Sequence, residues 1–106
     1  LGGVRRCLKL AERLGLPVVV SSALESSVGL RAGVALAAAL PELPYACGLN
    51  TATMFTTDVT TEPLVAVDGA IAVRPVTVDG AGWQADAAVA ARWVHRWEHG
   101  GMPERP

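Results

Sequence analysis

A chain of 106 residues with a net charge of −1 has room for one small domain at most, or for part of a larger one. About half of the residues (51%) are apolar, which excludes a disordered chain because there is enough apolar surface to offset chain entropy. Charges of both signs are scattered along the sequence, so no basic patch of the kind that binds nucleic acid or an anionic membrane is present.

The cysteines and the lengths of the apolar stretches indicate in which cellular compartment the protein is found. Cys7 and Cys47 fit no metal-binding or redox spacing and indicate a reducing compartment, so we expect a cytoplasmic protein. The longest apolar stretch, residues 28–40, contains Arg31 and falls short of the roughly 20 residues that cross a bilayer. No basic region followed by an apolar run opens the chain, so no secretory signal is expected. Because the first residue is Leu, we expect that the chain does not begin where its gene begins.

The first half of the chain alternates between helical and extended patterns. Apolar residues recur at helical spacing over residues 2–15, and a short β-branched run without alternation follows at 17–21. A second helix, rich in small residues, is predicted over 24–40, and a short strand over 45–48. Helices that alternate with short buried strands are typical of βα units around a parallel sheet.

The second half predicts a hairpin and a final helix. Two alternating runs flank Asp68-Gly69, a dipeptide that favours tight hairpin turns. Asp86 is expected to cap a helix that runs to about Glu98. The face of this helix that is predicted to be buried comprises Ala90, Trp93, Val94 and Trp97. Residues 101–106 are predicted to form a disordered tail.

Two histidines on the final helix have a spacing that some metal sites use. His95 and His99 are four residues apart, which places them on one face of a helix. Arg96 follows His95 where an H-E-x-x-H motif needs a glutamate. We therefore interpret the pair as exposed histidines near a helix end and expect no metal there.

The sequence VVVSSALESS, residues 18–27, passes from a buried strand to hydroxyl groups and then to a helix start. Ser22 and Glu25 have the spacing of a capping box, in which each side chain bonds the other residue's backbone N–H. Ligands of parallel α/β folds bind beyond the carboxyl ends of the strands, where this junction lies. Two interpretations stay open: these residues only cap the helix, or the helix start also binds an anion such as a carboxylate.

The most specific segments of the chain are SSALESSVGL and ACGL, within LGGVRRCLKLAERLGLPVVVSSALESSVGL and ALAAALPELPYACGL. They resemble the C-terminal part of actinobacterial o-succinylbenzoate synthases, a family of the enolase superfamily, and the resemblance covers residues 1 to about 75. It implies an α/β fold, the C-terminal portion of a (β/α)7β TIM-like barrel. Residues 1–57 would form the last βα units of the barrel, and residues 58–100 a hairpin and helix that return toward a cap domain.

The resemblance implies a Mg²⁺-dependent dehydratase of menaquinone biosynthesis, which converts 2-succinyl-6-hydroxy-2,4-cyclohexadiene-1-carboxylate to o-succinylbenzoate. In that family a lysine removes a proton alpha to a carboxylate, and Asp, Glu and Asp at successive strand ends hold the metal. No such trio is evident here, and the only lysine is Lys9, on a polar helix face. We therefore predict no catalytic residue and no metal ligand in this chain, which would be inactive alone, with the lysines and ligands upstream of Leu1.

By the same resemblance, the ends of the seventh and eighth strands contact a small-molecule carboxylate substrate. The predicted substrate-binding residues are Ser21, Ser22, Ser26, Gly48, Leu49 and Asn50. Ser22 and Glu25 are predicted in addition to cap the helix. Gly48 suits a close approach of backbone to a ligand, and an ordinary turn glycine is the open alternative.

Two other functions stay open at this point. One is an N-acylamino acid racemase or dipeptide epimerase of the same superfamily, and the other is a self-standing α/β binding module without catalysis. The residues after the expected eighth strand offer Asn50 and threonines but no acid, which suits a dehydratase better than a racemase. A piece of a barrel exposes a strand edge and apolar helix faces, so the isolated chain is expected to self-associate.

Overall fold

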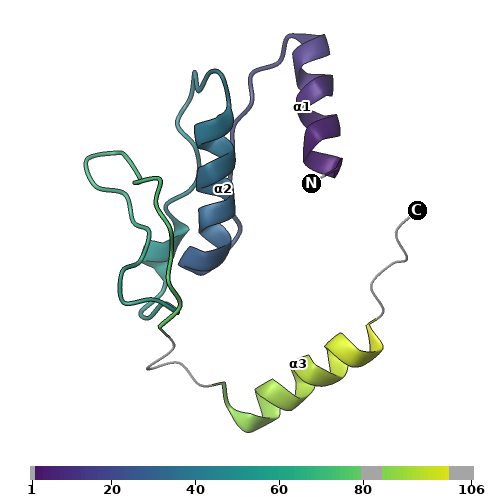
Figure 1. The fold of residues 1–106 in the computed structure, drawn as a ribbon, viewed down its shortest axis with the longest axis vertical. Coiled ribbons are helices and arrows are strands. Elements are labelled where there is room, and N and C mark those ends of the chain that lie inside the picture. Colours follow the sequence, from purple (N-terminus) through teal and green to yellow (C-terminus); the bar gives the residue numbers. More distant parts are fainter. Residues whose placement is uncertain (1, 80–84, 101–106) are drawn as a thin grey trace.

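The computed structural model describes residues 2–79 and 85–100. Its helices are α1 (Gly2–Leu14), α2 (Ser27–Ala39), the 3-10 helix η1 (Thr51–Met54) and α3 (Ala87–His99). Figure 1 shows α2 in the middle of the molecule, with the loops that follow it lying alongside. α1 and α3 lie at the periphery, and neither contains a buried residue.

The N-terminal helix α1 forms where the apolar spacing predicts it and ends at Leu14, one residue before the predicted end. Gly15 and Leu16 close it, because their N–H groups donate to the Glu12 and Ala11 carbonyls at 3.1 and 2.9 Å. The apolar stripe of α1 is only partly covered: Leu8 and Ala11 are half-buried, whereas Val4 and Leu14 keep 39% and 60% of their surface.

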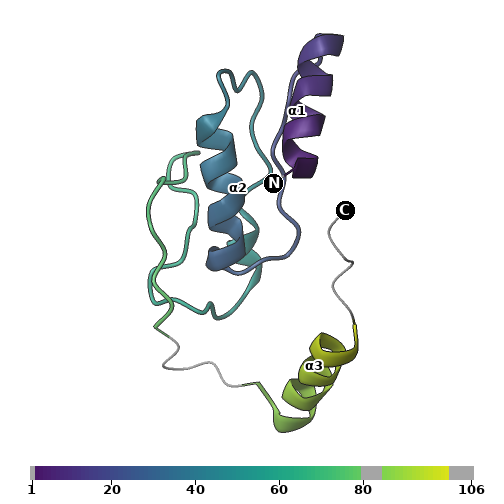
Figure 2. The same ribbon diagram turned by 45° about the vertical axis from the view of Figure 1, so that its right-hand side comes forward.

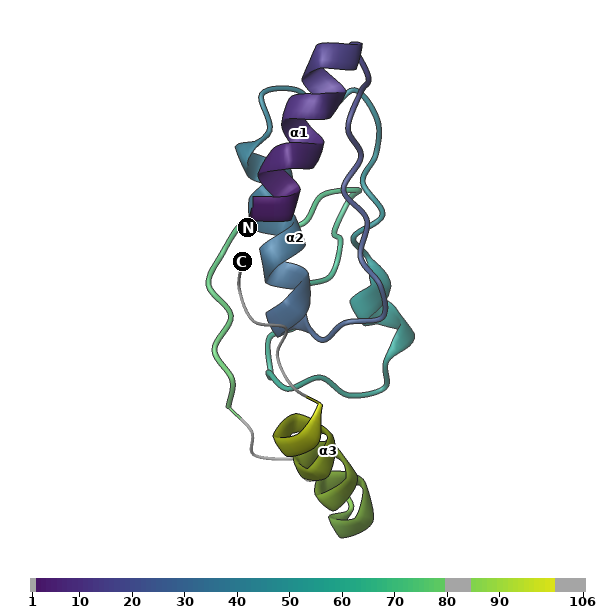
Figure 3. The same ribbon diagram turned by 90° about the vertical axis from the view of Figure 1, so that its right-hand side faces the viewer.

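The segments predicted as strands over 17–21 and 45–48 do not form strands within the residues that this structure describes. The segments do meet, in parallel, through a single bridge between Ser21 and Gly48. The Ser22 N–H donates to the Gly48 carbonyl at 2.9 Å, and the Gly48 N–H donates to the Val20 carbonyl at 3.0 Å. Figure 3 shows the two traces running beside each other. A parallel ladder depends on neighbours on both sides, and each segment here has only the other.

The core lies between α2 and these two segments. Leu30, Val34 and Ala37 line one face of α2 at helical spacing and are all buried. They pack with the other buried apolar side chains, which are Val20, Leu49, Ala52 and Leu64. Leu30 has no exposed surface and Leu64 keeps 2%, so this small cluster is the main source of apolar stabilisation in the described chain.

A tight turn at Asp68-Gly69 follows Leu64, the last buried core residue along the chain. Asp68 and Gly69 have φ angles of 50° and 79°, the positive values that a two-residue hairpin turn requires. Val67 and Ala70 exchange N–H to carbonyl bonds of 2.9 and 3.0 Å, forming one antiparallel bridge. The predicted turn is therefore present. Beyond this single bridge, the alternating runs on either side of the turn form no further β-ladder within the described residues.

The C-terminal helix α3 begins as predicted and packs differently from the prediction. The Asp86 carboxylate accepts from the N–H groups of Ala88 and Val89, at 2.8 and 3.4 Å. Figures 1 and 2 show α3 standing apart from α2. Trp93 and Trp97 keep 58% and 82% of their surface, so the predicted burial of this face is wrong here, because no described element packs against it. The tail predicted over 101–106 lies outside the described residues.

Candidate functional site

Three of the predicted substrate-binding residues meet at the ends of the two bridged segments. Ser21 and Gly48 form the bridge, and the Ser22 hydroxyl donates to the Gly48 carbonyl at 2.9 Å. The Ser22 and Thr51 hydroxyl oxygens are 2.9 Å apart. Because the Ser22 proton is directed to Gly48, Thr51 is the donor in this pair. We call Ser21, Ser22, Gly48 and Thr51 the serine–glycine cluster.

The absence of a side chain at Gly48 is required by its contact with Ser21. A Cβ atom at position 48 would lie 2.8 Å from the Ser21 hydroxyl oxygen and 3.5 Å from the Ser21 Cβ. The first of these distances is shorter than the contacts that real Cβ atoms make. Gly48 therefore serves a close approach of two chain segments, which supports neither the turn interpretation nor, by itself, contact with a ligand.

The predicted capping box of Ser22 and Glu25 is not formed. α2 begins at Ser27 instead of residue 24, and its N-cap residue, Ser26, makes no side-chain cap bond. Glu25 reaches only the Ala23 N–H, at 3.4 Å, while Ser22 is engaged in the serine–glycine cluster. The N–H of Ser27, the first residue of α2, donates instead to a carboxylate from a distant loop.

That group is Asp58. Its two carboxylate oxygens accept from the Ser27 N–H at 3.2 and 3.1 Å, and one of them accepts from the Ser27 hydroxyl at 2.5 Å. Val59 donates its own N–H to the same carboxylate at 2.7 Å, and the Leu64 N–H donates to the Ser27 hydroxyl oxygen at 2.8 Å. A negative charge is favourable at a helix N-terminus, so Asp58 takes the position that an anionic ligand would otherwise occupy.

Leu49 and Asn50 are turned toward the protein. Leu49 is a core residue with 6% of its surface exposed. The Asn50 side-chain oxygen accepts from the Ala66 N–H at 2.8 Å, and its carbonyl accepts from the Thr53 hydroxyl at 2.8 Å. The Leu49 side chain therefore belongs to the core, and the Asn50 side chain stabilises the loop through its oxygen. Asn50 is exposed and its NH₂ group has no partner within residues 2–79 and 85–100, so this group and the two backbone N–H groups remain candidates for a ligand.

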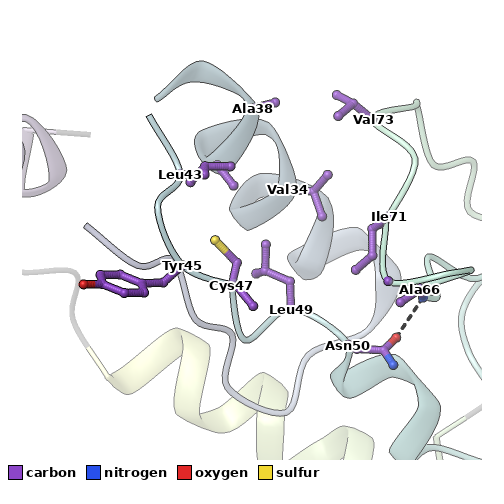
Figure 4. A pocket seen from close by; sticks show the side chains of 13 residues that line it. Val34, Ala38, Leu43, Tyr45, Cys47, Leu49, Asn50, Ala66, Ile71 and Val73 are labelled. Atoms are coloured by element: carbon purple, nitrogen blue, oxygen red, sulfur yellow. Dashed lines mark hydrogen bonds between the residues drawn. The ribbon is translucent and has the colours of Figure 1, made fainter. Parts of the chain in front are cut away.

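A cavity of about 340 Å³ is lined by Cys47 and Leu49, the neighbours of Gly48 in the chain, but by no member of the serine–glycine cluster itself. Figure 4 shows Val34, Leu49, Ile71 and Val73 around it, with the Cys47 thiol at one side and the bond from Asn50 to residue 66 at the other. Its lining is largely apolar and includes the predicted residues Leu49 and Asn50, but none of the predicted serines. We therefore regard it as space between α2 and the hairpin and not as the candidate site.

A second cavity, of about 290 Å³, is lined by one of the predicted serines, Ser26. It lies between the loop that precedes α2 and the loop that follows η1. Its lining comprises Leu24, Ser26, Phe55, Thr57, Asp58 and Val59. The Ser26 hydroxyl has no partner within residues 2–79 and 85–100, so it is available to a ligand at this cavity.

The described residues contain no cluster of three or more histidine, cysteine or acidic side chains that could hold a metal ion. His95 and His99 are near each other, with ring centroids 4.2 Å apart, and His99 Nδ1 is 2.9 Å from the His95 carbonyl oxygen. Lys9 is exposed on α1. This part of the chain does not fit a magnesium centre, and no chemical step through a metal can be assigned to its residues.

One acidic group outside the cluster has a perturbed pKa. The Thr61 hydroxyl, followed by the Thr61 backbone N–H, holds the pKa of Asp79 below its usual value of 3.8. The backbone N–H bond is 2.7 Å long. Nearby, Arg74 donates to the Glu62 carbonyl at 2.7 Å. These contacts tie residues 61–62 to residues 74–79.

Sequence reasoning missed Thr51, Ser27 and Asp58. Thr51 directly follows Asn50, so its proximity to the predicted site was available from the sequence order alone. Ser27 and Asp58 are separated by 31 residues, and no local capping pattern links them. A bond of this kind becomes visible only when the fold brings the two segments together.

Comparison with known proteins identifies the relationship of this chain. The model of the family described as enolase C-terminal domain-like matches residues 1–98. The chain belongs to this enolase C-terminal domain-like family. The resemblance drawn from SSALESSVGL and ACGL is thereby confirmed at the level of the enolase superfamily.

Three curated relatives of this enolase-family chain are each named o-succinylbenzoate synthase. The o-succinylbenzoate synthase of Thermobifida fusca (strain YX) is 59% identical over 104 aligned residues, covering 88% of this chain and 33% of the relative. Those of Mycobacterium leprae (strain TN) and Mycolicibacterium smegmatis are each 52% identical over 99 residues, covering 91% of this chain and 29% and 30% of the relatives. The chain thus spans about a third of the length of these relatives. None of the described helices is both long and apolar enough to span a membrane.

Proposed function

We propose that this chain is the C-terminal, substrate-binding part of an o-succinylbenzoate synthase, a hydro-lyase that converts 2-succinyl-6-hydroxy-2,4-cyclohexadiene-1-carboxylate to o-succinylbenzoate. The observation that carries the proposal is sequence identity of 52–59% to synthases of that name over 88–91% of the chain. The matched region is about a third of each relative. The proposal therefore concerns the reaction of a longer protein, to which this chain contributes one part.

The same proposal gives the chain its place in a (β/α)7β barrel. α1 is the helix after the sixth strand, residues 17–21 are the seventh strand and residues 45–48 are the eighth. The parallel bridge between Ser21 and Gly48, with α2 as the connection, supports this assignment, since parallel neighbours joined by a helix make a βαβ unit. Residues 58–100 then return toward a cap domain. Strands supplied by the rest of the barrel complete both ladders.

In the longer protein, a bound magnesium ion would supply stabilisation of negative charge on substrate oxygens. The described residues lack a ligand cluster, so the proposal assigns the metal ligands and the catalytic lysines to other parts of the protein. Lys9 is excluded as the base because it lies on the exposed face of a peripheral helix.

The role left for this chain is to bind the carboxylate-bearing side of the substrate. The hydroxyls of Ser21 and Ser26 have no partner within the described ranges, and we assign them as donors to the carboxylate. The backbone N–H groups of Leu49 and Asn50 add two further donors beside Gly48. Ser22 orients the site through its bonds to Gly48 and Thr51 and reaches the substrate only by rotating its hydroxyl.

The decisive experiment is an assay of the full-length protein that carries this chain. Formation of the aromatic product, followed by its ultraviolet absorbance, is expected in the presence of Mg²⁺. Racemisation of N-acylamino acids without dehydration would favour the racemase function instead. Absence of both activities in folded protein would leave only the binding-module function.

A variant pair tests the substrate-binding role. Ser21→Ala removes a candidate donor to a charged group, which should raise KM about tenfold or more, because hydrogen bonds to charged groups contribute about 1.5–3 kcal/mol. Thr77→Ala removes an exposed hydroxyl far along the chain and should leave KM unchanged. Equal KM values in the two variants would contradict the assignment of Ser21.

The proposal extends to the isolated chain, which we expect to be inactive and to self-associate. Leu24, Met54 and Trp97 keep 63%, 69% and 82% of their surface, and such exposure of large apolar groups favours association. A single monomer by light scattering, with a cooperative thermal transition, would contradict this. The proposal includes a cytoplasmic location, supported by the unpaired Cys7 and Cys47, and no nucleic-acid or membrane partner.

A further inference from the structure

The start of α2 is held by one buried residue. Ser27 has no exposed surface, yet both its polar groups are satisfied. Its N–H and its hydroxyl donate to the Asp58 carboxylate, at 3.1 and 2.5 Å for the closest pairs, and its hydroxyl oxygen accepts from the Leu64 N–H at 2.8 Å. A buried serine with a complete set of partners fixes the position of every group that it touches.

The carboxylate that holds Ser27 belongs to the second loop of the candidate site. Asp58 follows η1 and residues 55–57, whereas Ser27 directly follows Ser26 and the loop 22–26. The bonds between Ser27 and Asp58 therefore join the end of one site loop to the end of the other. At the other end of the first loop, the Ser22 hydroxyl is 2.9 Å from the hydroxyl of Thr51, the first residue of η1, and η1 leads directly into the second loop.

The 290 Å³ cavity lies between these two loops. Leu24 and Ser26 come from the first loop. The second loop supplies the rest of the lining: Phe55, Thr57, Asp58 and Val59. Because each loop supplies part of the lining, the width of the cavity depends on how the loops are held relative to each other. The Ser27–Asp58 bonds fix that spacing at one end, and the Ser22–Thr51 bond fixes it at the other.

We propose that Asp58 is a positioning residue for substrate binding: by bonding Ser27 it sets the spacing of loops 22–26 and 55–59, and thereby the place of the Ser26 hydroxyl. This inference rests on the proposed function of the chain as a substrate-binding part. Asp58 does not itself bind the substrate carboxylate, since two negative charges repel. Nor is it a proton carrier, since its oxygens already accept from Ser27 and Val59.

The test uses Asp58→Asn in the full-length protein, with Val34→Ala as the matched control. Asparagine keeps the size of the side chain but turns an N–H₂ group toward donors of Ser27 or Val59, so at least one bond is lost. Val34 is buried in the middle of α2, with 5% of its surface exposed, and contacts neither loop's polar network. Both variants should lower the melting temperature, but only Asp58→Asn should change the site.

Two measurements separate positioning from a purely structural role. KM should rise about tenfold in Asp58→Asn, with kcat changed much less, while Val34→Ala keeps the KM of the parent. Amide hydrogen exchange should become faster in residues 22–27 and in 55–59 together. If Asp58→Asn fails to fold, Ser27→Ala provides the second variant. It keeps the carboxylate and the Ser27 N–H bond, and it loses the hydroxyl with its bonds to Asp58 and Leu64.

The outcomes are distinct. A KM increase with faster exchange in both loops supports the inference. A lower melting temperature with unchanged KM, as in Val34→Ala, overturns it and leaves Asp58 as a stabilising cap. If the parent protein shows no dehydratase activity, the proposed function fails, and hydrogen exchange in Asp58→Asn then tests whether Asp58 couples the two loops. Faster exchange in both loops supports the coupling. Faster exchange in one loop alone overturns it.

Discussion

Replacing Gly48 with alanine tests the close approach at the centre of the candidate site. The new methyl carbon would lie 2.8 Å from the Ser21 hydroxyl oxygen, well inside van der Waals contact, and 3.5 Å from the Ser21 Cβ. The hydroxyl can move to another staggered rotamer, whereas the Cβ distance is already an ordinary contact. We expect Gly48→Ala to destabilise the full-length protein by about 1–2 kcal/mol, at the lower part of the range for overpacking.

The assay is urea denaturation of a double-mutant cycle. In the Ser21→Ala background the clashing oxygen is gone, so Gly48→Ala should cost little, and the coupling should be about 1 kcal/mol. A cost of Gly48→Ala that is the same in both backgrounds would refute the reasoning. It would mean that the alanine side chain clashes with the backbone or with a group other than the Ser21 hydroxyl.

Three further predictions concern the core, one helix cap and one acidic group. Leu30→Ala should lower the free energy of unfolding by about 2–5 kcal/mol, because Leu30 has no exposed surface; a loss below about 1 kcal/mol in urea denaturation would contradict that burial. Asp86→Ala should cost α3 about 1 kcal/mol and speed exchange of the Ala88 amide, and unchanged exchange would contradict its role as the cap. The pKa of Asp79 is lowered by the Thr61 hydroxyl and then by the Thr61 backbone N–H, so the stability from this contact is present above pH 3.8 and is lost as the pH falls through the depressed pKa. Hydrogen exchange of the Thr61 amide, corrected for its intrinsic pH dependence, should accelerate as the pH falls from 3.8 through the pKa of Asp79. Asp79→Asn should abolish this acceleration.

Features set by neighbouring residues were predictable from the sequence. The apolar repeat of α1, the cap of α3 at Asp86 and the turn at Asp68-Gly69 each depend on a few consecutive positions, and the structure has all three. The family relationship was predictable for a different reason. SSALESSVGL and ACGL are specific as strings, and they identify relatives without any knowledge of contacts.

Features that depend on distant partners were not predictable. The spacing of Ser22 and Glu25 matches a capping box, but Ser22 bonds Gly48 instead, and Asp58 caps the helix from 31 residues away. The valines before Ser21 have the composition of a buried strand, yet pairing needs neighbours, and only one is present among the described residues. Likewise, the apolar face with Trp93 and Trp97 predicts a partner surface without specifying which element provides it.

The long sequence separation of Ser27 and Asp58 has a consequence for synthesis. While the ribosome makes this region, residues 27–39 emerge before the carboxylate that caps them, so the first turn of α2 starts without its acceptor. A helix of that length is marginal in water without tertiary support. We therefore expect α2 to remain frayed until residue 58 has left the exit tunnel, and the core around Leu30 and Leu64 to assemble only then. Nascent chains arrested just before and just after Asp58 clears the tunnel should differ sharply in protease sensitivity near Ser27.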